Sequence, residues 1–316
     1  MVTRLRVAFF GTPAFAVPTL RQLLASSHEV CGVVTQPDRP RGRGQRVTDA
    51  PVKALAVERG LPVLQPDRLK EPTVAEAISQ WRPDLGVVAA YGRILPSSLL
   101  DVPRLGMINV HASLLPRYRG AAPVHRAVMA GDAETGVTIM RVVPELDAGA
   151  MLASVTRPIG VDDTADVVEH DLAEHGAVLL VRIVDALAAG PVAERPQDSS
   201  EATYAPRLTK AEGLIDWTLP ARQIHDRVRG LYPWPHAYSY LAGERLIVLA
   251  SRVDDAAADA PPGAIIEGSQ DAIHIAAGGR TRLVITRLQP EGRRAMEARE
   301  FLAGHAIPAG SRFGVE

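Results

Sequence analysis

Apolar runs alternate with helix-like segments through the first third of the chain. Three runs are apolar almost throughout and predict buried strands, at residues 5–10, 30–34 and 84–90. The segments between them have apolar residues at helical spacing, at residues 13–24, 51–59 and 73–81. Apolar strands that alternate with helices are typical of a parallel sheet covered on both faces. We therefore predict an α/β fold: a Rossmann-like, mostly parallel sheet with helices on both faces.

The stretch 106–126 begins as a strand and carries polar side chains where that strand ends. Met107, Ile108 and Val110 are its apolar residues, and Asn109 and His111 stand two positions apart. Residues i and i+2 of a strand share one face, so we expect an amide and an imidazole to project side by side. The structural alternative is a strand followed by an ordinary polar loop, with both residues as turn formers.

The pattern changes in the second half of the chain. Two strands at 135–143 and 150–157, expected to be an antiparallel pair, precede a long helix that ends at residue 189. The next stretch lacks apolar periodicity and carries Pro191 and Pro196, which indicates a linker.

Beyond the linker, a helix at 221–229 precedes four short apolar segments separated by Gly and Asp turns, at residues 246–249, 263–266, 272–275 and 282–285. This pattern favours a small, OB-like β-barrel. We therefore expect a catalytic domain at 1–189, a linker at 190–207 and a barrel domain at 208–316.

Composition indicates an ordinary soluble protein rather than a membrane or secreted one. Of the 316 residues 47% are hydrophobic and 22% charged, and the net charge of −1 carries no message about nucleic acid. The single cysteine, Cys31, excludes an intramolecular disulfide and fits a reducing compartment. No apolar run reaches 18 residues, and the first residues lack the apolar core of a signal peptide. We expect a cytoplasmic monomer that does not enter a membrane.

Three polar residues together suit acyl-type transfer to an amine. The first strand-to-helix turn offers only Gly11 where a dinucleotide fingerprint needs three glycines, which argues against a dehydrogenase. Ligands collect beyond the carboxyl ends of parallel strands, where Asn109 and His111 are expected. Asn109 is suited to donate to an oxyanion, His111 to stabilise the same charge, and Asp147 to orient the histidine and accept a proton. Asp147 also fits a plain Asx-type turn before Gly149.

No serine or cysteine nucleophile with a neighbouring base is evident, which favours direct attack by the amine over a covalent intermediate. The histidines have no metal-ligand spacing, so we expect no metal. Residues 36–46 contain four arginines and almost no apolar residue, which is typical of a solvated loop or of one that reaches phosphates.

Several local motifs together point to a family. Asn109-Val-His111 is followed by Ser113-Leu-Leu-Pro116, and Asp147 lies downstream. The other motifs are Thr35-Gln-Pro-Asp-Arg-Pro, Gly42-Arg-Gly, Arg117-Tyr-Arg-Gly-Ala-Ala-Pro123, Tyr204-Ala-Pro-Arg-Leu-Thr-Lys210 and Pro233-Trp-Pro235. Over nearly the whole chain, this set resembles the 10-formyltetrahydrofolate-dependent formyltransferases, in particular those that act on charged initiator tRNA.

The resemblance implies an activity and a set of site residues. The activity is transfer of a formyl group from 10-formyltetrahydrofolate, a co-substrate, to the α-amine of methionyl initiator tRNA through a tetrahedral intermediate. The implied catalytic residues are Asn109, His111 and Asp147. The implied folate-binding residues are Ser113, Leu114, Leu115 and Pro116. The implied tRNA-binding residues are Arg39, Arg41, Arg43, Arg46 and Lys210, with Arg43 matching an arginine that contacts the acceptor stem.

One position departs from the family pattern. Family members often have glycine after the histidine, and this chain has Ala112. One extra methyl is tolerated only if the backbone there avoids a positive φ.

Two rival functions remain open at this point. A formyltransferase acting on the amine of a sugar nucleotide or of glycinamide ribonucleotide would share the three catalytic residues but need neither the arginine loop nor the barrel. A folate- or RNA-binding module without catalysis would bind but not transfer.

Overall fold

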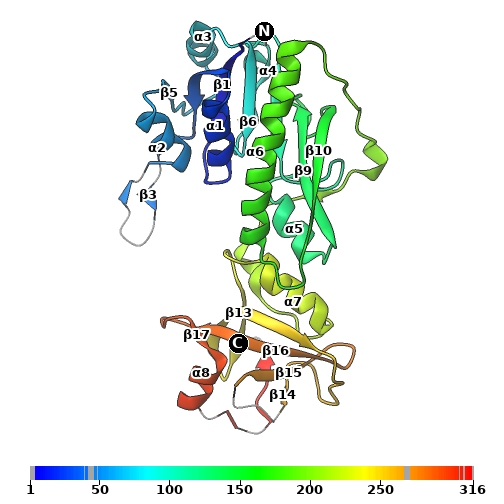
Figure 1. Cartoon of the computed structure of the whole chain (residues 1–316). Coiled ribbons are helices and arrows are strands. Elements are labelled where there is room, and N and C mark those ends of the chain that lie inside the picture. Colours follow the sequence, from blue (N-terminus) through cyan, green and yellow to red (C-terminus); the bar gives the residue numbers. More distant parts are fainter. Residues whose placement is uncertain are drawn as a thin grey trace. The chain divides into compact units, whose positions relative to one another are not determined.

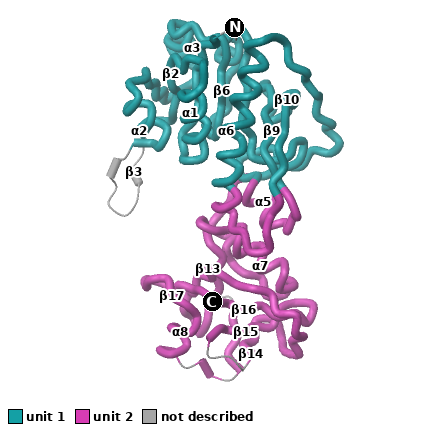
Figure 2. Tube along the Cα trace, viewed as in Figure 1, with its two compact units in different colours: residues 1–123, 135–157, 169–205 teal, residues 124–134, 158–168, 206–316 magenta. Residues whose placement is uncertain are grey.

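The computed structural model describes residues 4–38, 40–41, 46–47, 49–266, 271–305, 307–308 and 310–314 (Figure 1). The chain divides into two compact units, each assembled from three separate segments (Figure 2). Unit 1 comprises Met1–Pro123, Thr135–Arg157 and Glu169–Ala205. Unit 2 comprises Val124–Glu134, Pro158–Val168 and Pro206–Glu316.

Unit 1 is built on a seven-stranded sheet with the order β10-β9-β7-β6-β1-β2-β5. Its strands are β1 (Arg6–Gly11), β2 (Glu29–Val34), β5 (Val63–Leu64), β6 (Leu85–Ala89), β7 (Met107–His111), β9 (Glu134–Arg141) and β10 (Met151–Pro158). The pairs from β5 to β7 are parallel, and β9 joins β7 antiparallel. This confirms the mostly parallel α/β sheet. The parallel arrangement brings the carboxyl ends of β1, β6 and β7 to one edge.

Helices cover both faces of this sheet, as expected. They are α1 (Ala16–Ala25), α2 (Pro51–Glu58), α3 (Pro72–Gln80), α4 (Ser97–Leu100) and α6 (Ala165–Ala189), part of which belongs to unit 2. One apolar cluster joins Met107 of β7 to Ile78 of α3 and Leu99 of α4. On the other face, Gly176 of α6 lies against Val110. Strand alternation thus gives the two faces of β7 different neighbours.

Unit 2 contains an antiparallel sheet with the order β14-β15-β16-β13-β12-β18. Its strands are β12 (Ala237–Leu241), β13 (Glu244–Asp254), β14 (Ile265–Ile266), β15 (Ile273–Ala277), β16 (Thr281–Pro290), β18 (Phe313–Gly314) and β17 (Met296–Glu297), which pairs with β16. A bridge between Ala264 and Arg312 joins the two ends of this order, which closes the sheet into the expected barrel. Ile224 and Val228 of α7 (Ala221–Gly230) and Phe301 of α8 (Ala298–Gly304) fill its core.

Short elements escape the apolar pattern because they bury few residues. They are β3 (Pro40–Arg41) paired with β4 (Arg46–Val47), β8 (Arg119–Gly120) paired with β11 (Tyr204–Ala205), α5 (Pro123–Met129) and the 3₁₀ turns η1 (Ser199–Glu201) and η2 (Lys210–Gly213). Within the described residues, no helix has both the length and the apolar character needed to cross a membrane.

Helix α6 offers a test of the packing in unit 1. Leu172 is fully buried, whereas Val178 is 44% exposed. Leu172→Ala is expected to lower the free energy of unfolding by about 2–5 kcal/mol because it leaves a cavity. Val178→Ala, the matched control on the same helix, is expected to change it by less than about 0.5 kcal/mol. Urea denaturation of both variants measures the difference, and equal losses would contradict this packing.

Candidate active site

β7 presents two polar side chains on one face of the sheet. Met107, Asn109 and His111 alternate with Ile108 and Val110, and Val110 faces α6. Asn109 is half-buried and is the only asparagine in the chain. Among the described residues its amide has no hydrogen-bond partner, so its N–H groups are available to a ligand.

His111 is buried, and its ring is held by a hydrogen bond at Nε2. Its Nε2 lies 3.0 Å from the carbonyl oxygen of Tyr118. A carbonyl only accepts, so Nε2 carries a proton in this arrangement. Its Nδ1 lies 3.7 Å from Oδ2 of Asp147, which is longer than a hydrogen bond. Nδ1 therefore faces a carboxylate without being bonded to it.

Asp147 is fixed by the chain opposite it. Its Oδ2 accepts a hydrogen bond from the backbone N–H of Gly120 at 2.8 Å. Its backbone has a φ of 47°, in the left-handed region that few non-glycine residues adopt. The structure thus brings Asp147 to His111, and His111 shares its strand face with Asn109.

The turn after β7 uses much of the predicted folate segment for its own hydrogen bonds. The hydroxyl of Ser113 donates to the carbonyl of Arg117 at 2.6 Å. The hydroxyl of Thr138 donates to the carbonyl of Ser113 at 2.7 Å and accepts from the N–H of Leu115 at 3.2 Å. Ser113 and Leu115 are buried, and Leu114 and Pro116 are only partly exposed.

Ala112, which follows His111, can carry its methyl group without strain if its backbone avoids a positive φ. Ala112 is not among the residues of positive φ. The alanine in place of the family's glycine therefore adds no backbone strain.

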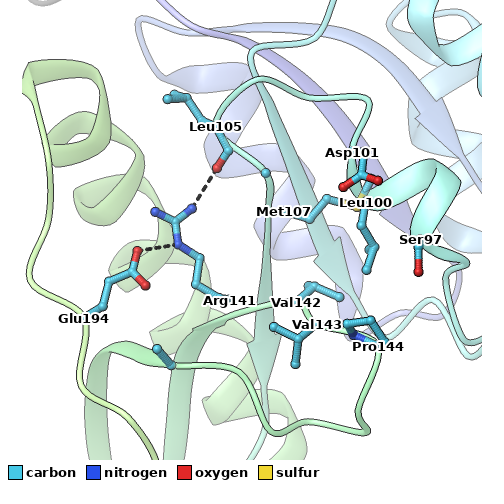
Figure 3. Close-up of a pocket in the computed structure, with 12 residues that line it drawn as sticks. Ser97, Leu100, Asp101, Leu105, Met107, Arg141, Val142, Val143, Pro144 and Glu194 are labelled. Carbon is cyan, nitrogen blue, oxygen red and sulfur yellow. Dashed lines mark hydrogen bonds and ion pairs between the residues drawn. The ribbon is translucent and has the colours of Figure 1, made fainter.

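A cavity of about 550 Å³ opens beside the start of β7 (Figure 3). It is lined by Ser97, Leu100, Asp101, Leu105, Gly106, Met107, Arg141, Val142, Val143, Pro144, Ala150 and Glu194. Met107 shares its strand face with Asn109 and His111, and Pro144 stands three residues before Asp147. Arg141 donates to the carbonyl of Leu105 at 2.8 Å and to Glu194 at 2.7 Å. No local sequence pattern marks this cavity, because its walls come from five separate stretches of the chain.

The carboxyl edge of the sheet also holds the start of residues 36–46, the stretch with four arginines. The side chain of Gln36 donates to the carbonyl of Tyr91 at 2.7 Å, and its backbone N–H donates to the hydroxyl of Thr12 at 3.3 Å. Burial raises the pKa of the Tyr91 hydroxyl to about 12, so it stays neutral.

Lys53 binds two carboxylates, one within residues 36–46 and one just after them. Its ammonium forms ion pairs with Asp38 and, at 2.8 Å, with Asp49.

The candidate tRNA-contacting arginines are only partly covered by the structure. Arg39 and Arg43 lie outside the described residues, and Arg41 and Arg46 are described by their backbone alone, in β3 and β4.

Lys210 belongs to unit 2, where it begins η2 and is exposed. Thr209 and Glu212 close a capping box around this turn. A hydrogen bond from Arg126 holds the pKa of the Glu212 carboxyl below its usual value. The turn that carries Lys210 is therefore firmly held within unit 2.

The described residues contain no group of three or more His, Cys, Asp or Glu side chains arranged to hold a metal ion. Of the histidines outside the site, His225 contacts the carbonyl of Val161 at 2.8 Å and the hydroxyl of Ser251 at 3.2 Å. Such contacts are structural.

Comparison with known proteins shows the family. A family model described as "Formyl transferase" matches residues 5–184, and one described as "Formyl transferase, C-terminal domain" matches residues 207–306. A curated methionyl-tRNA formyltransferase of Methylococcus capsulatus is 50% identical over 310 residues, 98% of this chain and 100% of its own length. One of Bacillus licheniformis is 46% identical and covers 98% of both chains.

Solved structures share the fold at low sequence identity. WlaRD, a sugar 3N-formyl transferase solved in the presence of dTDP and 5-N-formyl-THF, has a TM-score of 0.68 at 14% identity over 92% of this chain and 99% of its own. HypX from Aquifex aeolicus, in complex with tetrahydrofolic acid, has a TM-score of 0.64 at 17% identity, and the match covers 95% of this chain and 47% of HypX.

An α/β sheet with an amide, an imidazole and a carboxylate at the end of β7, followed by an antiparallel barrel, fits an enzyme that transfers formyl groups. The chain belongs to the formyl transferase family and, within it, to the methionyl-tRNA formyltransferases.

Proposed function

We propose that this chain transfers a formyl group from 10-formyltetrahydrofolate to the α-amino group of methionyl initiator tRNA. The acceptor is supported by full-length relatives named for methionyl-tRNA. The observation that carries the chemistry is the meeting of Asn109, His111 and Asp147 at the end of β7. Asn109 has an unused amide there, and His111 faces Asp147 across 3.7 Å.

The proposed reaction is a direct attack of the neutral α-amine on the formyl carbon. The new C–N bond pushes the carbonyl electrons onto oxygen, and the oxyanion accepts hydrogen bonds from the Asn109 amide and from Nδ1–H of His111. Asp147 stabilises the imidazolium and takes up the proton that the amine loses. Collapse of the tetrahedral intermediate breaks the bond to N10 of the folate, which leaves with a proton.

We place the folate donor in the cavity beside Met107. Residues two apart on a strand are separated by about 6.6 Å, so a ring bound against Met107 lies one such step from Asn109. Leu100, Val142 and Val143 give the cavity the apolar walls that a flat ring system prefers. Ser113, Leu114, Leu115 and Pro116 then contribute the turn that borders the reacting group.

The tRNA contacts follow from the resemblance and the charges. We assign them to Arg39, Arg41, Arg43, Arg46 and Lys210. Residues 1–189 would carry the transfer, 190–207 the connection and 208–316 the barrel that contacts the tRNA. We propose that the protein works as a cytoplasmic monomer.

The decisive experiment supplies 10-formyltetrahydrofolate with charged initiator tRNA and, in parallel, with charged elongator tRNA. Formylation of the initiator alone supports both donor and acceptor. Formylation of a sugar-nucleotide or glycinamide ribonucleotide amine in place of the tRNA would overturn the acceptor, and binding without transfer would overturn the enzyme.

Removing either oxyanion donor is expected to slow turnover. Asn109→Ala and His111→Ala should each lower kcat by roughly 100- to 1000-fold, because each removes a hydrogen bond to the oxyanion. His175→Ala, an exposed histidine on α6, is the control and should leave kcat unchanged. Near-normal turnover in either site variant would sink the assignment.

Filling the cavity with a larger side chain is expected to weaken binding of the folate donor. Val143→Phe should raise the Michaelis constant for 10-formyltetrahydrofolate by roughly 10-fold, equivalent to about 1.4 kcal/mol, and leave that for tRNA unchanged. Val57→Phe, at an exposed valine outside the cavity, is the matched control. If only the Michaelis constant for tRNA rose, the proposal that the folate binds in this cavity would be wrong.

Arg43 is expected to contact a phosphate. Arg43→Ala should raise the Michaelis constant for tRNA and reduce the slope of log affinity against log salt by about 1. Arg59→Ala, an exposed arginine at the end of α2, should change neither. Unchanged kinetics and salt dependence for Arg43→Ala would return the segment to an ordinary surface loop.

A further inference from the structure

A largely irregular segment, which contains η1 and β11, runs beside the turn that holds His111 and Asp147. The segment is residues 195–205, which we call the strap. The N–H of Tyr118 donates to the hydroxyl of Thr203, and the N–H of Arg119 donates to its carbonyl, each at 2.8 Å. β11 of the strap then pairs with β8, which contains Gly120. The carbonyl of Tyr118 and the N–H of Gly120 are the two groups that bind His111 and Asp147.

Gln197 of the strap reaches Asp147 directly. Its amide nitrogen donates to the carbonyl oxygens of Asp147 and Gly149, both at 2.8 Å. Its amide oxygen accepts from Nε of Arg119 at 3.0 Å and from Nη2 at 2.8 Å. A guanidinium only donates and a carbonyl only accepts, so these partners fix which end of the amide is oxygen. Every hydrogen bond that Gln197 makes here serves the turn of Asp147 or the residue before Gly120.

Arg119 is an unusual partner for that amide. It is only 5% exposed, and it forms no ion pair with a carboxylate among the described residues. Buried arginines are normally paired with an opposite charge. Here the amide oxygen of Gln197 takes that role, and a charge-assisted bond is stronger than one between neutral groups. The cation therefore locks the orientation in which Gln197 donates to the Asp147 turn.

The turn needs such support. Asp147 has its left-handed φ of 47°, and a Cβ added to Gly149 would lie 1.9 Å from the carbonyl oxygen of Arg141. Residues in sparsely populated backbone regions persist only where their surroundings hold them. Gly120 holds the carboxylate of Asp147, and Gln197 holds the carbonyls on both sides of Ala148.

We propose that Arg119 and Gln197 are positioning residues for the formyl transfer: they set the place of the Asp147 carboxylate opposite Nδ1 of His111. Neither residue touches the reacting atoms in this scheme. The proposal rests on the function proposed above for Asn109, His111 and Asp147.

Gln197→Glu separates positioning from folding. The new carboxylate keeps an acceptor for Arg119 and nearly the same volume, so the buried cation stays paired. It loses both N–H donors, however, and turns an oxygen toward the carbonyls of Asp147 and Gly149. The carboxylate then repels the two carbonyl oxygens to which the amide of Gln197 donated hydrogen bonds. Glu201→Gln, at an exposed glutamate of the same strap, is the matched control.

We expect the variant to change kcat but not the Michaelis constants. Gln197→Glu should lower kcat by roughly 100-fold, as a small misplacement of a catalytic group does, while both Michaelis constants stay unchanged. Arg119→Lys, which cannot make the paired donation to Gln197, should give the same changes in smaller measure, and Glu201→Gln should give none.

A measurement without substrate keeps this proposal apart from the proposed function. The amide proton of Gly120 reports its bond to the Asp147 carboxylate, and its NMR resonance should move in Gln197→Glu and stay in place in Glu201→Gln. If this resonance moves but the wild-type protein transfers no formyl group, the proposed function fails and the positioning stands. If wild-type transfer is normal and Gln197→Glu keeps its kcat and the Gly120 resonance, the positioning is overturned. A loss of activity that only follows a loss of folded protein, with the Gly120 resonance unmoved in the folded fraction, would also overturn it.

Discussion

His111 and Asp147, which we propose take part in the transfer, depend on two backbone groups of one turn. The carbonyl of Tyr118 accepts from Nε2 of His111 and so fixes the orientation of the ring, and the N–H of Gly120 fixes the carboxylate of Asp147. A sheet edge supplies His111 in a rigid place, but Asp147 comes from a loop after the neighbouring strand. The turn between residues 116 and 122 is therefore the part that converts a parallel sheet with polar ends into a site with a defined geometry.

The fold follows from the sequence because burial has a period. Runs such as residues 30–34 and 84–90 are apolar at almost every position, which is typical of a strand covered on both faces. The same alternation placed Asn109 and His111 on one face of β7. β12 escaped this reasoning because Tyr238 and Tyr240 are only partly buried and alternate with small Ala237 and Ser239.

The site follows from the sequence less completely. The approach of Asp147 to His111 depends on a turn whose shape is set by Gln197, 50 residues further along the chain. Gln197 lies in a stretch interpreted as a linker because hydrogen bonds from an irregular segment leave no apolar period. The hydroxyl of Ser113, attributed by resemblance to the folate site, is used by the carbonyl of Arg117. Sequence patterns report burial well and polar partners poorly, since a polar partner has no fixed sequence separation.

Each of the two units is built from separate segments of the chain, so neither unit corresponds to one continuous stretch of sequence. α7 in unit 2 forms hydrogen bonds with residues that lie far before the barrel in the sequence. The carbonyl of Gly230 contacts the ring of His125 at 2.7 Å, and Arg229 donates to the carbonyl of Asp163 at 3.1 Å. A gene fragment that begins at the barrel would leave these groups without partners. Recombination that exchanges whole barrels between relatives therefore has to carry, or to match, two short pieces of sequence that lie well before the barrel in the gene.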